Sequence, residues 1–378
     1  MTPLDWLLTA FCLTATSLHI VTSLLAMRRC RQRAASLRAP EPAPLVSILR
    51  PVRGLDHCEE VTLGSSFGLD YPNFELIFCC ADADDPAVAE IRSLIARNPG
   101  VKARLLIGNH DICLNPKLNN LVKGWRAAAG DWIVFADSNV LMPRDYVQRL
   151  FAGWRPETGV LCAPPIACSV MGFWAELECA FLNGYQARWQ YAADSIGMGF
   201  AQGKTMLMRR SDLAQAGGIQ VLAQEIAEDA AATKLVRGMG LRVALVDAPF
   251  GQPLGPRTAR QVWDRQTRWA RLRRMSFPGF FAIEILTGCV LPLAAAAWVA
   301  DALDASPAVL LAGLSALWIG TEALLAWAAG WHLRLWSPFA WALRDALLPL
   351  VWMHAWLSEG YAWRGNEIST AQQSAPTR

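Results

Sequence analysis

Apolar residues fill two long stretches, one at each end of the chain, and alternate with polar residues between them. Residues 6–27 are apolar almost throughout and contain one ionisable residue, His19. About 20 such residues cross a bilayer as a helix. Four arginines follow between positions 28 and 33, and no basic residue precedes the stretch. This is the reverse of the charge order in a cleavable signal peptide, so the positive-inside rule puts the N-terminus outside and the following chain in the cytoplasm. We therefore expect an N-terminal membrane anchor over residues 1–35.

A second apolar block predicts a C-terminal membrane region over residues 277–363. Residues 280–300 and 307–331 each have the length of one span, although Glu284 and Pro292 interrupt the first of them. The polar residues 364–378 predict a loose tail.

Residues 339–357 are a weaker candidate span because they contain Arg344 and Asp345. This segment either crosses the membrane or lies in its interface as an amphipathic helix. Glu322, in the preceding span, could pair with these charges inside the helix bundle, or one of the three could snorkel to the surface. We favour a structural role for them.

Between the membrane regions, residues 44–256 alternate short apolar runs with helical periodicity. Strands are predicted at 46–49, 76–80, 103–107 and 132–136, and helices at 118–129 and 144–151. A further helix is predicted from Pro86, with Asp85 as its cap. This alternation indicates an α/β fold with a mostly parallel sheet and helices on both faces. Ligands of such sheets bind at the carboxyl ends of the strands, where Asp82 and Asp137 fall.

Motifs, net charge and cysteine spacing exclude several classes of function. The sequence has neither a Walker-type phosphate loop nor a glycine-rich dinucleotide fingerprint, so a nucleotide must be held another way. One such way is a strand-end carboxylate that carries a divalent cation to a diphosphate. The net charge of +3, without a long basic run, argues against nucleic acid as a partner. Ten cysteines without zinc-type spacing predict reduced thiols, which fits a domain that faces the cytoplasm.

Three acids and one basic motif stand in order along the chain. Asp82 and Asp137 follow strands, Asp229 lies in Ala227-Glu228-Asp229, and Arg265-Gln266-Thr267-Arg268-Trp269 directly precedes the second membrane region. Taken alone, a strand-end aspartate is more often a helix cap than a ligand. The ordered set between membrane segments is what indicates an active site.

This set resembles the ceramide glucosyltransferase family of lipid glycosyltransferases over residues 46–275. The match extends to Asn115-Pro116-Lys117-Leu118-Asn119-Asn120-Leu121 and to Ala223-Gln224-Glu225-Ile226-Ala227-Glu228-Asp229. Leu207-Met208-Arg209-Arg210, leading to Gln215-Ala216-Gly217-Gly218, is also similar. Hopanoid glycosyltransferases share the acids but match the stretch from Asn115 less closely. The resemblance implies the fold called GT-A for residues 44–256.

The resemblance also implies roles for the acids. Asp82 contacts the uridine, Asp137 holds a metal, Mg²⁺ or Mn²⁺, and Lys117 belongs to the donor site. Asp229 is the general base for the acceptor hydroxyl, with Glu228 as the alternative base and a first-turn helix cap as the structural reading. The chain departs from the usual Asp-x-Asp because position 139 is asparagine, which predicts weaker metal binding.

The basic motif has two interpretations that can both hold. By resemblance, Arg265 and Arg268 supply cations at the leaving group, and Trp269 stacks on the acceptor or packs in the interface. Residues 257–275 also predict a basic interfacial helix on anionic headgroups. Lys204, in Gly203-Lys204-Thr205, is a weaker phosphate candidate because a solvated surface lysine is commoner.

The expected function is an inverting transfer of a hexose, by resemblance glucose, from a UDP-sugar to a lipid hydroxyl, by resemblance that of ceramide. A hopanoid or diacylglycerol acceptor is the alternative. A processive polysaccharide synthase shares the acids but needs a wider channel than three or four spans provide. A non-enzymatic receptor leaves the ordered acids unexplained. Abundant alanine and arginine favour a bacterial inner membrane, with the catalytic domain in the cytoplasm.

Overall fold

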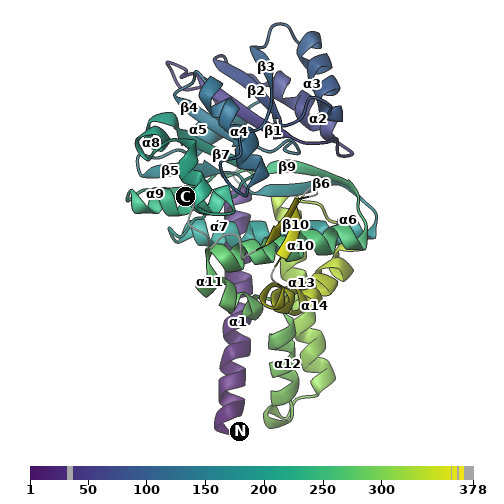
Figure 1. Ribbon diagram of the computed structural model, residues 1–378. Helices are drawn as coiled ribbons and strands as arrows, with labels where there is room; N and C mark the ends of the chain where they lie inside the picture. The colour runs from purple at the N-terminus through teal and green to yellow at the C-terminus, as the bar shows by residue number, and fades with distance from the viewer. Residues whose placement is uncertain (32–36, 359, 364–365, 370–378) are drawn as a thin grey trace. The chain divides into compact units, whose positions relative to one another are not determined.

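The computed structural model describes residues 1–31, 37–358, 360–363 and 366–369 (Figure 1). The chain divides into two compact units, each built from separate segments. The sheet unit comprises Arg29–Ser169 and Ala193–Gly255. The helical unit comprises Met1–Arg28, Val170–Ala192 and Pro256–Arg378.

The sheet unit contains a seven-stranded mixed sheet with the order β3-β2-β1-β4-β7-β5-β8. Its strands are β1 (Val46–Val52), β2 (Phe74–Cys80), β3 (Ala103–Ile107), β4 (Trp132–Ala136), β5 (Thr158–Cys162), β7 (Thr205–Arg209) and β8 (Arg242–Leu245). Strands β3, β2, β1 and β4, which are neighbours in the sheet, are parallel to one another. Strand β7 runs antiparallel to its neighbours β4 and β5. The mostly parallel α/β fold expected from the sequence is confirmed, as are its four predicted strands. A separate two-stranded sheet pairs β6 (Pro165–Met171) with β9 (Phe250–Pro256).

Helices of the sheet unit cover both faces of the sheet. They are α2 (Glu59–Gly64), α3 (Pro86–Arg97), α4 (Pro116–Ala127), α5 (Tyr146–Gly153), α8 (Arg210–Gln215) and α9 (Glu228–Gly238), with 3₁₀ turns at Ser65–Gly68 and Ile219–Gln224. Ile48 and its same-face neighbours pack with α3 and α5 in one core. Side chains alternate along a strand, so Leu49 faces the other way, toward α4. There a Cβ on Gly124 would lie 2.7 Å from the Cys79 sulfur, so only glycine permits this close approach.

Two helix starts illustrate how the sequence sets these elements. Asp85 accepts a hydrogen bond from the Ala87 N–H, and Asn115 accepts from the N–H groups of Lys117 and Leu118. In both helices proline occupies the first position, where the missing N–H costs nothing. The predicted cap at Asp85 is therefore confirmed.

The helical unit is built mainly from helices, of which α10 is basic and most of the others are apolar. They are α1 (Pro3–Cys30), α6 (Phe173–Ala180), α7 (Arg188–Ser195), α10 (Ala259–Ser276), α11 (Pro278–Ile283), α12 (Val290–Val299), α13 (Pro307–Ala329) and α14 (Ser337–Leu357). A π-helical segment, Phe181–Ala187, joins α6 to α7, and short 3₁₀ turns cover Glu284–Thr287 and Asp301–Leu303. Strands β10 (Gly360–Trp363) and β11 (Asn366–Ser369) form an antiparallel pair. Four residues of the expected tail 364–378 therefore form β11, and the other residues of the tail lie outside the part of the chain that the structure describes.

Among the described residues, α1 and α13 are long and apolar enough to cross a membrane. A third crossing is formed only if Pro278–Thr287 and Val290–Val299, bent by 51° at their junction, act as one broken span. The break falls in the predicted span 280–300. Helix α14 packs against α10 and α6 and is seen almost end-on in Figure 1, whereas α12 and α13 run down the page. This arrangement favours the interfacial interpretation of residues 339–357.

Buried charges tie α13 to α14. Arg344 contacts Glu322 at 2.5 and 2.9 Å and Asp345 at 2.8 Å, and each of the three side chains is at most 3% exposed. A Cβ on Gly184 would come within 2.5 Å of a Glu322 carboxylate oxygen, so a larger residue at this point of the π-helical segment would displace the Glu322 side chain. The three residues form a paired structural network, as favoured from the sequence, rather than snorkelling to the surface.

Candidate active site

Two of the predicted acids lie at the same edge of the sheet. Asp82 follows β2 and Asp137 follows β4, with the parallel strand β1 between them. Neighbouring strands are about 4.8 Å apart, so the two positions are separated by about 10 Å. Asp82 is exposed, and its Oδ1 accepts from the Asp84 N–H at 3.0 Å. This edge is therefore open to a ligand that reaches across β1.

Asp137 is held between two lysines. Its Oδ1 lies 2.6 Å from the Lys117 Nζ, and its Oδ2 lies 2.8 Å from the Lys204 Nζ. Lys117 comes from the first turn of α4, whereas Lys204 directly precedes β7. Burial alone would raise the pKa of Asp137, but the two ammonium groups outweigh burial and hold the pKa below its usual value. Asp137 is an anion throughout the neutral range.

Lys117 links this strand end to α9. Its Nζ lies 2.5 Å from a Glu228 carboxylate oxygen and donates to the Gly203 carbonyl at 2.7 Å. The Asn115 amide, whose oxygen caps α4, donates to the other Glu228 oxygen at 2.7 Å. Two sequence stretches more than a hundred residues apart are thus joined through one ammonium and one amide. The structure places Lys117 beside Asp137 and Glu228, and its part in donor binding stays a prediction from the sequence.

Asp229 lies beside this cluster in the first turn of α9. Its carboxylate accepts from the N–H of Gly203 at 2.9 Å and from the N–H of Ala230 at 2.8 Å. Burial and the negative charge of Glu228 raise the pKa of Asp229 to about 6, against the opposing effects of Lys117 and the two N–H groups. Glu228, in contrast, is tied to Lys117 and Asn115. Because Glu228 is already paired with Lys117 and Asn115, Asp229 is the better placed of the two acids to take a proton, and its role as the base stays a prediction from the sequence.

From the sequence, Lys204 was expected to be a solvated surface lysine, and Gly203 was given no role. The Lys204 side chain is 14% exposed and is not a solvated surface lysine. A Cβ on Gly203 would come within 2.7 Å of Glu228 and 3.1 Å of the Lys117 Nζ, so a larger residue would push the cluster apart. The signal lay in the apolar residues 206–208 of β7, which put the residues before Thr205 at the strand end.

The oxygens of Asp137 and Asn139 offer a partial site for a divalent cation. Among the described residues, no group of three or more His, Cys, Asp or Glu side chains could hold a metal ion. A carboxylate and an amide oxygen are nevertheless hard ligands of the kind that Mg²⁺ and Mn²⁺ accept, and a bound diphosphate can complete such a shell. The residues present fit a cation that arrives with the donor, provided that Lys204, which also donates to Asn139 at 3.1 Å, moves aside.

The basic motif lies in the helical unit, on α10. Arg265 is hydrogen-bonded to Glu178 of α6, a fully buried carboxylate that also accepts from the Arg257 Nε at 3.2 Å. Arg268 and Trp269 are partly exposed on the same helix. A capping box of Thr258 and Gln261 begins this helix, close to the predicted start at residue 257. The roles of Arg265, Arg268 and Trp269 toward a donor or acceptor stay predictions from the sequence.

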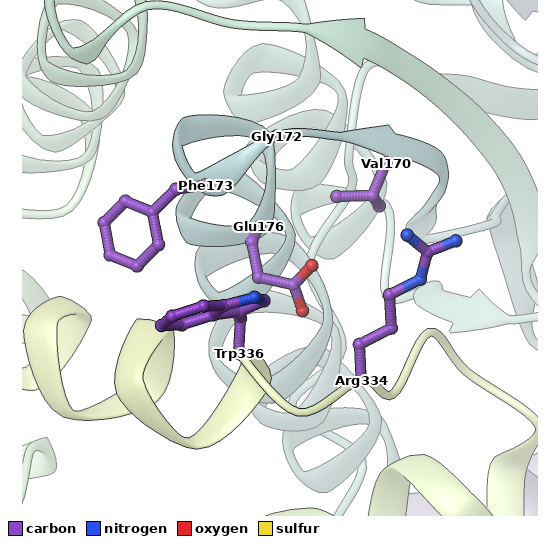
Figure 2. A pocket seen from close by; sticks show the side chains of 6 residues that line it. All are labelled: Val170, Gly172, Phe173, Glu176, Arg334 and Trp336. Atoms are coloured by element: carbon purple, nitrogen blue, oxygen red, sulfur yellow. The ribbon is translucent and has the colours of Figure 1, made fainter.

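The helical unit has a pocket of about 350 Å³ that sequence reasoning did not identify (Figure 2). Its lining residues are Val170, Gly172, Phe173, Glu176, Arg334 and Trp336. The Glu176 carboxylate accepts from His332 at 2.7 Å and from the Ser337 hydroxyl. None of the ordered acids lines this pocket. No sequence signal pointed to it, because its residues come from two segments 160 residues apart.

The raised pKa of Asp229 leads to a prediction about how the reaction rate depends on pH. If Asp229 must be ionised to act, kcat/KM should rise with pH through an apparent pKa of about 6 and level off above it. Glu228→Gln removes the neighbouring negative charge that raises this pKa, so the acid limb should move to lower pH. Initial rates measured across pH for both proteins test this expectation. An acid limb that Glu228→Gln leaves in place would mean that another group sets it.

Comparison with known proteins identifies the family of this chain. The profile described as "Glycosyl transferase family 21" matches residues 8–375, nearly the whole chain. Ceramide glucosyltransferase 1 of Caenorhabditis elegans is 26% identical over 358 residues, which cover 93% of this chain and 76% of the relative. The ceramide glucosyltransferase of Komagataella phaffii is 42% identical over 109 residues, which cover 28% of this chain and 21% of the relative.

A solved structure shares the fold. The mannosyltransferase PcManGT from Pyrobaculum calidifontis, in complex with GDP-mannose and Mn²⁺, superposes with a TM-score of 0.53. The superposition covers 90% of this chain and 99% of that one, at 19% sequence identity. At that identity the likeness establishes the GT-A-like fold and nothing about the ligands of this chain.

Proposed function

The chain belongs to glycosyl transferase family 21, and from that membership we propose that it is an inverting transferase that moves a hexose, glucose by preference, from a UDP-sugar to the hydroxyl of ceramide. That it is a glycosyltransferase with a lipid acceptor follows from the family and from its ceramide glucosyltransferase relatives. The donor sugar, the inversion and the identity of the lipid are the proposed parts.

One structural observation carries the chemistry. Asp229, with a pKa near 6, lies next to a cluster in which Lys117 and Lys204 flank Asp137. A proton acceptor thus stands beside a group of fixed cations, which is what transfer from a sugar diphosphate needs.

In the proposed reaction, a single displacement takes place at the anomeric carbon. The acceptor hydroxyl oxygen attacks this carbon from the face opposite the diphosphate, while Asp229 takes the hydroxyl proton. The bond from the carbon to the diphosphate oxygen breaks, and UDP leaves with the electron pair. Attack from the opposite face inverts the centre, so an α-linked donor gives a β-glycosyl lipid. Asp229 then returns its proton to water.

The donor is proposed to bind across the sheet edge. We place the uridine at Asp82, after β2, and the diphosphate at Lys117, which contacts Asp137 after β4. The ends of β2 and β4 are about 10 Å apart, so the donor would extend across β1. A divalent cation, Mg²⁺ or Mn²⁺, would be held by Asp137 and Asn139, and when bound it would offset negative charge on the diphosphate. The mannosyltransferase of the same fold holds Mn²⁺ in its complex with GDP-mannose, which supports this part of the proposal.

The motif on α10 is proposed to serve the same reaction. Arg265 and Arg268 would stabilise charge on the departing diphosphate, and Trp269 would contact the lipid acceptor. This proposal rests on the resemblance of the motif and on its position directly before α11, where the membrane region begins. A guanidinium fork suits phosphate oxygens because it donates two parallel hydrogen bonds.

The proposed location is the bacterial inner membrane, with the sheet unit in the cytoplasm. The apolar residues of α1 and the arginines that follow support this orientation. Arg29 also pairs with Asp194 and Asp247, at 2.7 Å each, so part of this positive charge fixes the start of the sheet unit. A cytoplasmic site would meet the nucleotide sugars of the cell.

The test of the proposed acceptor is mass spectrometry of lipids from cells with and without the protein. Hexosylceramide should appear only with the active protein when ceramide is supplied. A hexose on a hopanoid or on diacylglycerol instead would replace ceramide as the acceptor. A long polysaccharide would favour a processive synthase and contradict the proposal.

A further inference from the structure

The position of Lys204 is fixed by the backbone as well as by its side chain. Thr205 pairs with Ala136 in the β4–β7 ladder, and the Asp137 N–H donates to the Lys204 carbonyl at 3.0 Å. Lys204, which precedes β7, and Asp137, which follows β4, therefore lie side by side at this end of the sheet. The side chain then reaches back to the same strand end.

At that point the Lys204 ammonium bridges two oxygens. Its Nζ donates to the Asp137 Oδ2 at 2.8 Å and to the Asn139 Oδ1 at 3.1 Å. Positions 137 and 139 are the two that carry carboxylates in an Asp-x-Asp pair. With asparagine at 139, this pair of oxygens has one negative charge instead of two. A monovalent ammonium matches one charge, whereas a divalent cation suits two.

The neighbouring lysine increases the positive charge at this place. Lys117 contacts the other Asp137 oxygen but is shared with Glu228. Two ammonium groups therefore flank a single carboxylate at the strand end. Both Lys204 and Asp137 remain partly accessible, at 14% and 22% exposure of their side chains. A diphosphate that arrives at this edge can reach the ammonium without unfolding the strand end.

We propose that Lys204 is a built-in cation of the donor site, which binds the diphosphate and takes over part of the task of a divalent cation. This inference rests on the proposed function, because the nucleoside diphosphate is the ligand. It predicts a donor site that works without added metal, although a cation can still improve binding. It also gives Asn139 a role, since a second carboxylate there would hold Lys204 more tightly and away from the donor.

The expected size of the effect follows from charge-assisted hydrogen bonding. One such bond to a phosphate oxygen changes affinity by about 10- to 100-fold. Lysine is a common phosphate ligand because its compact ammonium acts as a point charge. Removing it should therefore weaken UDP binding in chelator by about that factor, while saturating Mg²⁺ or Mn²⁺ should recover most of the loss.

The test measures UDP binding by isothermal titration calorimetry on the full chain in detergent, in chelator and in saturating Mg²⁺. The variants are Lys204→Met and, as a second form without charge, Lys204→Gln, whose amide can still donate to Asp137. Lys102→Met is the matched control, because Lys102 is 66% exposed and pairs with Glu75 at 3.6 Å. The wild type and the control should bind UDP in chelator, and both Lys204 variants should bind it much more weakly.

The outcomes separate this inference from the proposed function. Equal UDP affinity of wild type and both Lys204 variants in chelator would overturn the role of Lys204 and leave the proposed function intact. Wild-type binding that disappears entirely in chelator would do the same, because the metal would then be indispensable. If the wild type bound no nucleoside diphosphate with or without metal, the proposed function itself would fail. Restoration of both variants by Mg²⁺ shows that they are folded.

Discussion

Asp229→Asn should lower kcat by about 10²- to 10⁴-fold while UDP binding stays close to that of the wild type. Asparagine has the shape of aspartate, and its one amide oxygen can keep one of the two hydrogen bonds that the N–H groups of Gly203 and Ala230 donate to separate carboxylate oxygens. The substitution removes the ability to take a proton and leaves the donor cluster around Asp137 in place. Steady-state kinetics with the lipid acceptor and a separate UDP titration together measure both halves of this expectation.

A first-turn acid elsewhere in the fold provides the control. Asp212 lies in the first turn of α8 and is half-buried, so Asp212→Asn tests what a helix-terminal carboxylate contributes by itself. Such a contribution is small, about 0.3–1 kcal/mol of stability. If Asp229→Asn resembled Asp212→Asn, with nearly full turnover, Asp229 would be a helix-end residue and Glu228 would become the candidate base.

Lys117→Met should damage both stability and catalysis. The lysine side chain is 12% exposed and contacts Asp137, at 22%, and Glu228, at 7%. Removing one partner of a buried ion pair typically costs about 3–5 kcal/mol, because the remaining charges lose their compensation. Lys117 also lowers the pKa of Asp229, so its loss should move the acid limb of the pH profile upward, opposite to the shift expected for Glu228→Gln.

The measurements are the thermal midpoint and the pH dependence of the rate. Lys102→Met again serves as the control, because exposed ion pairs contribute about 0–1 kcal/mol. Lys117→Met should melt well below both the wild type and this control. A midpoint equal to that of the control would show that Asp137 and Glu228 do not depend on Lys117, and that Lys117 does not stabilise the contact between α4 and α9.

The sequence predicted the parts of the fold that local pattern controls. The strand Ala103–Ile107 and the cap at Asp85 follow from apolar runs and from the chemistry of a single turn. The direction of β7 could not be predicted in this way, because pairing between distant strands leaves no local pattern. Helices α6 and α7 were missed for a related reason. Their buried apolar residues belong to the helical unit although their sequence lies inside the expected cytoplasmic domain.

The site shows the same division. Asp82, Asp137 and Asp229 could be singled out because their flanking residues form recognisable stretches, and the structure places Lys117 between two carboxylates. Lys204 was underestimated because its burial depends on β7 pairing with β4. The partner of Arg265, Glu178, lies 87 residues away on α6, and only the fold brings the two together. Charge pairing over such distances has no counterpart in sequence spacing.

The anomeric configuration of the lipid product shows whether the sugar is transferred by a single displacement at which Asp229 takes the proton. Purified protein would be given UDP-glucose, in which the sugar is α-linked, together with ceramide, and the product would be examined by proton NMR at the anomeric position. We expect a β-glucosyl lipid from the wild type and almost none from Asp229→Asn. An α-linked product, a sugar polymer, or the absence of any glycosylated lipid with every nucleotide sugar tested would contradict it.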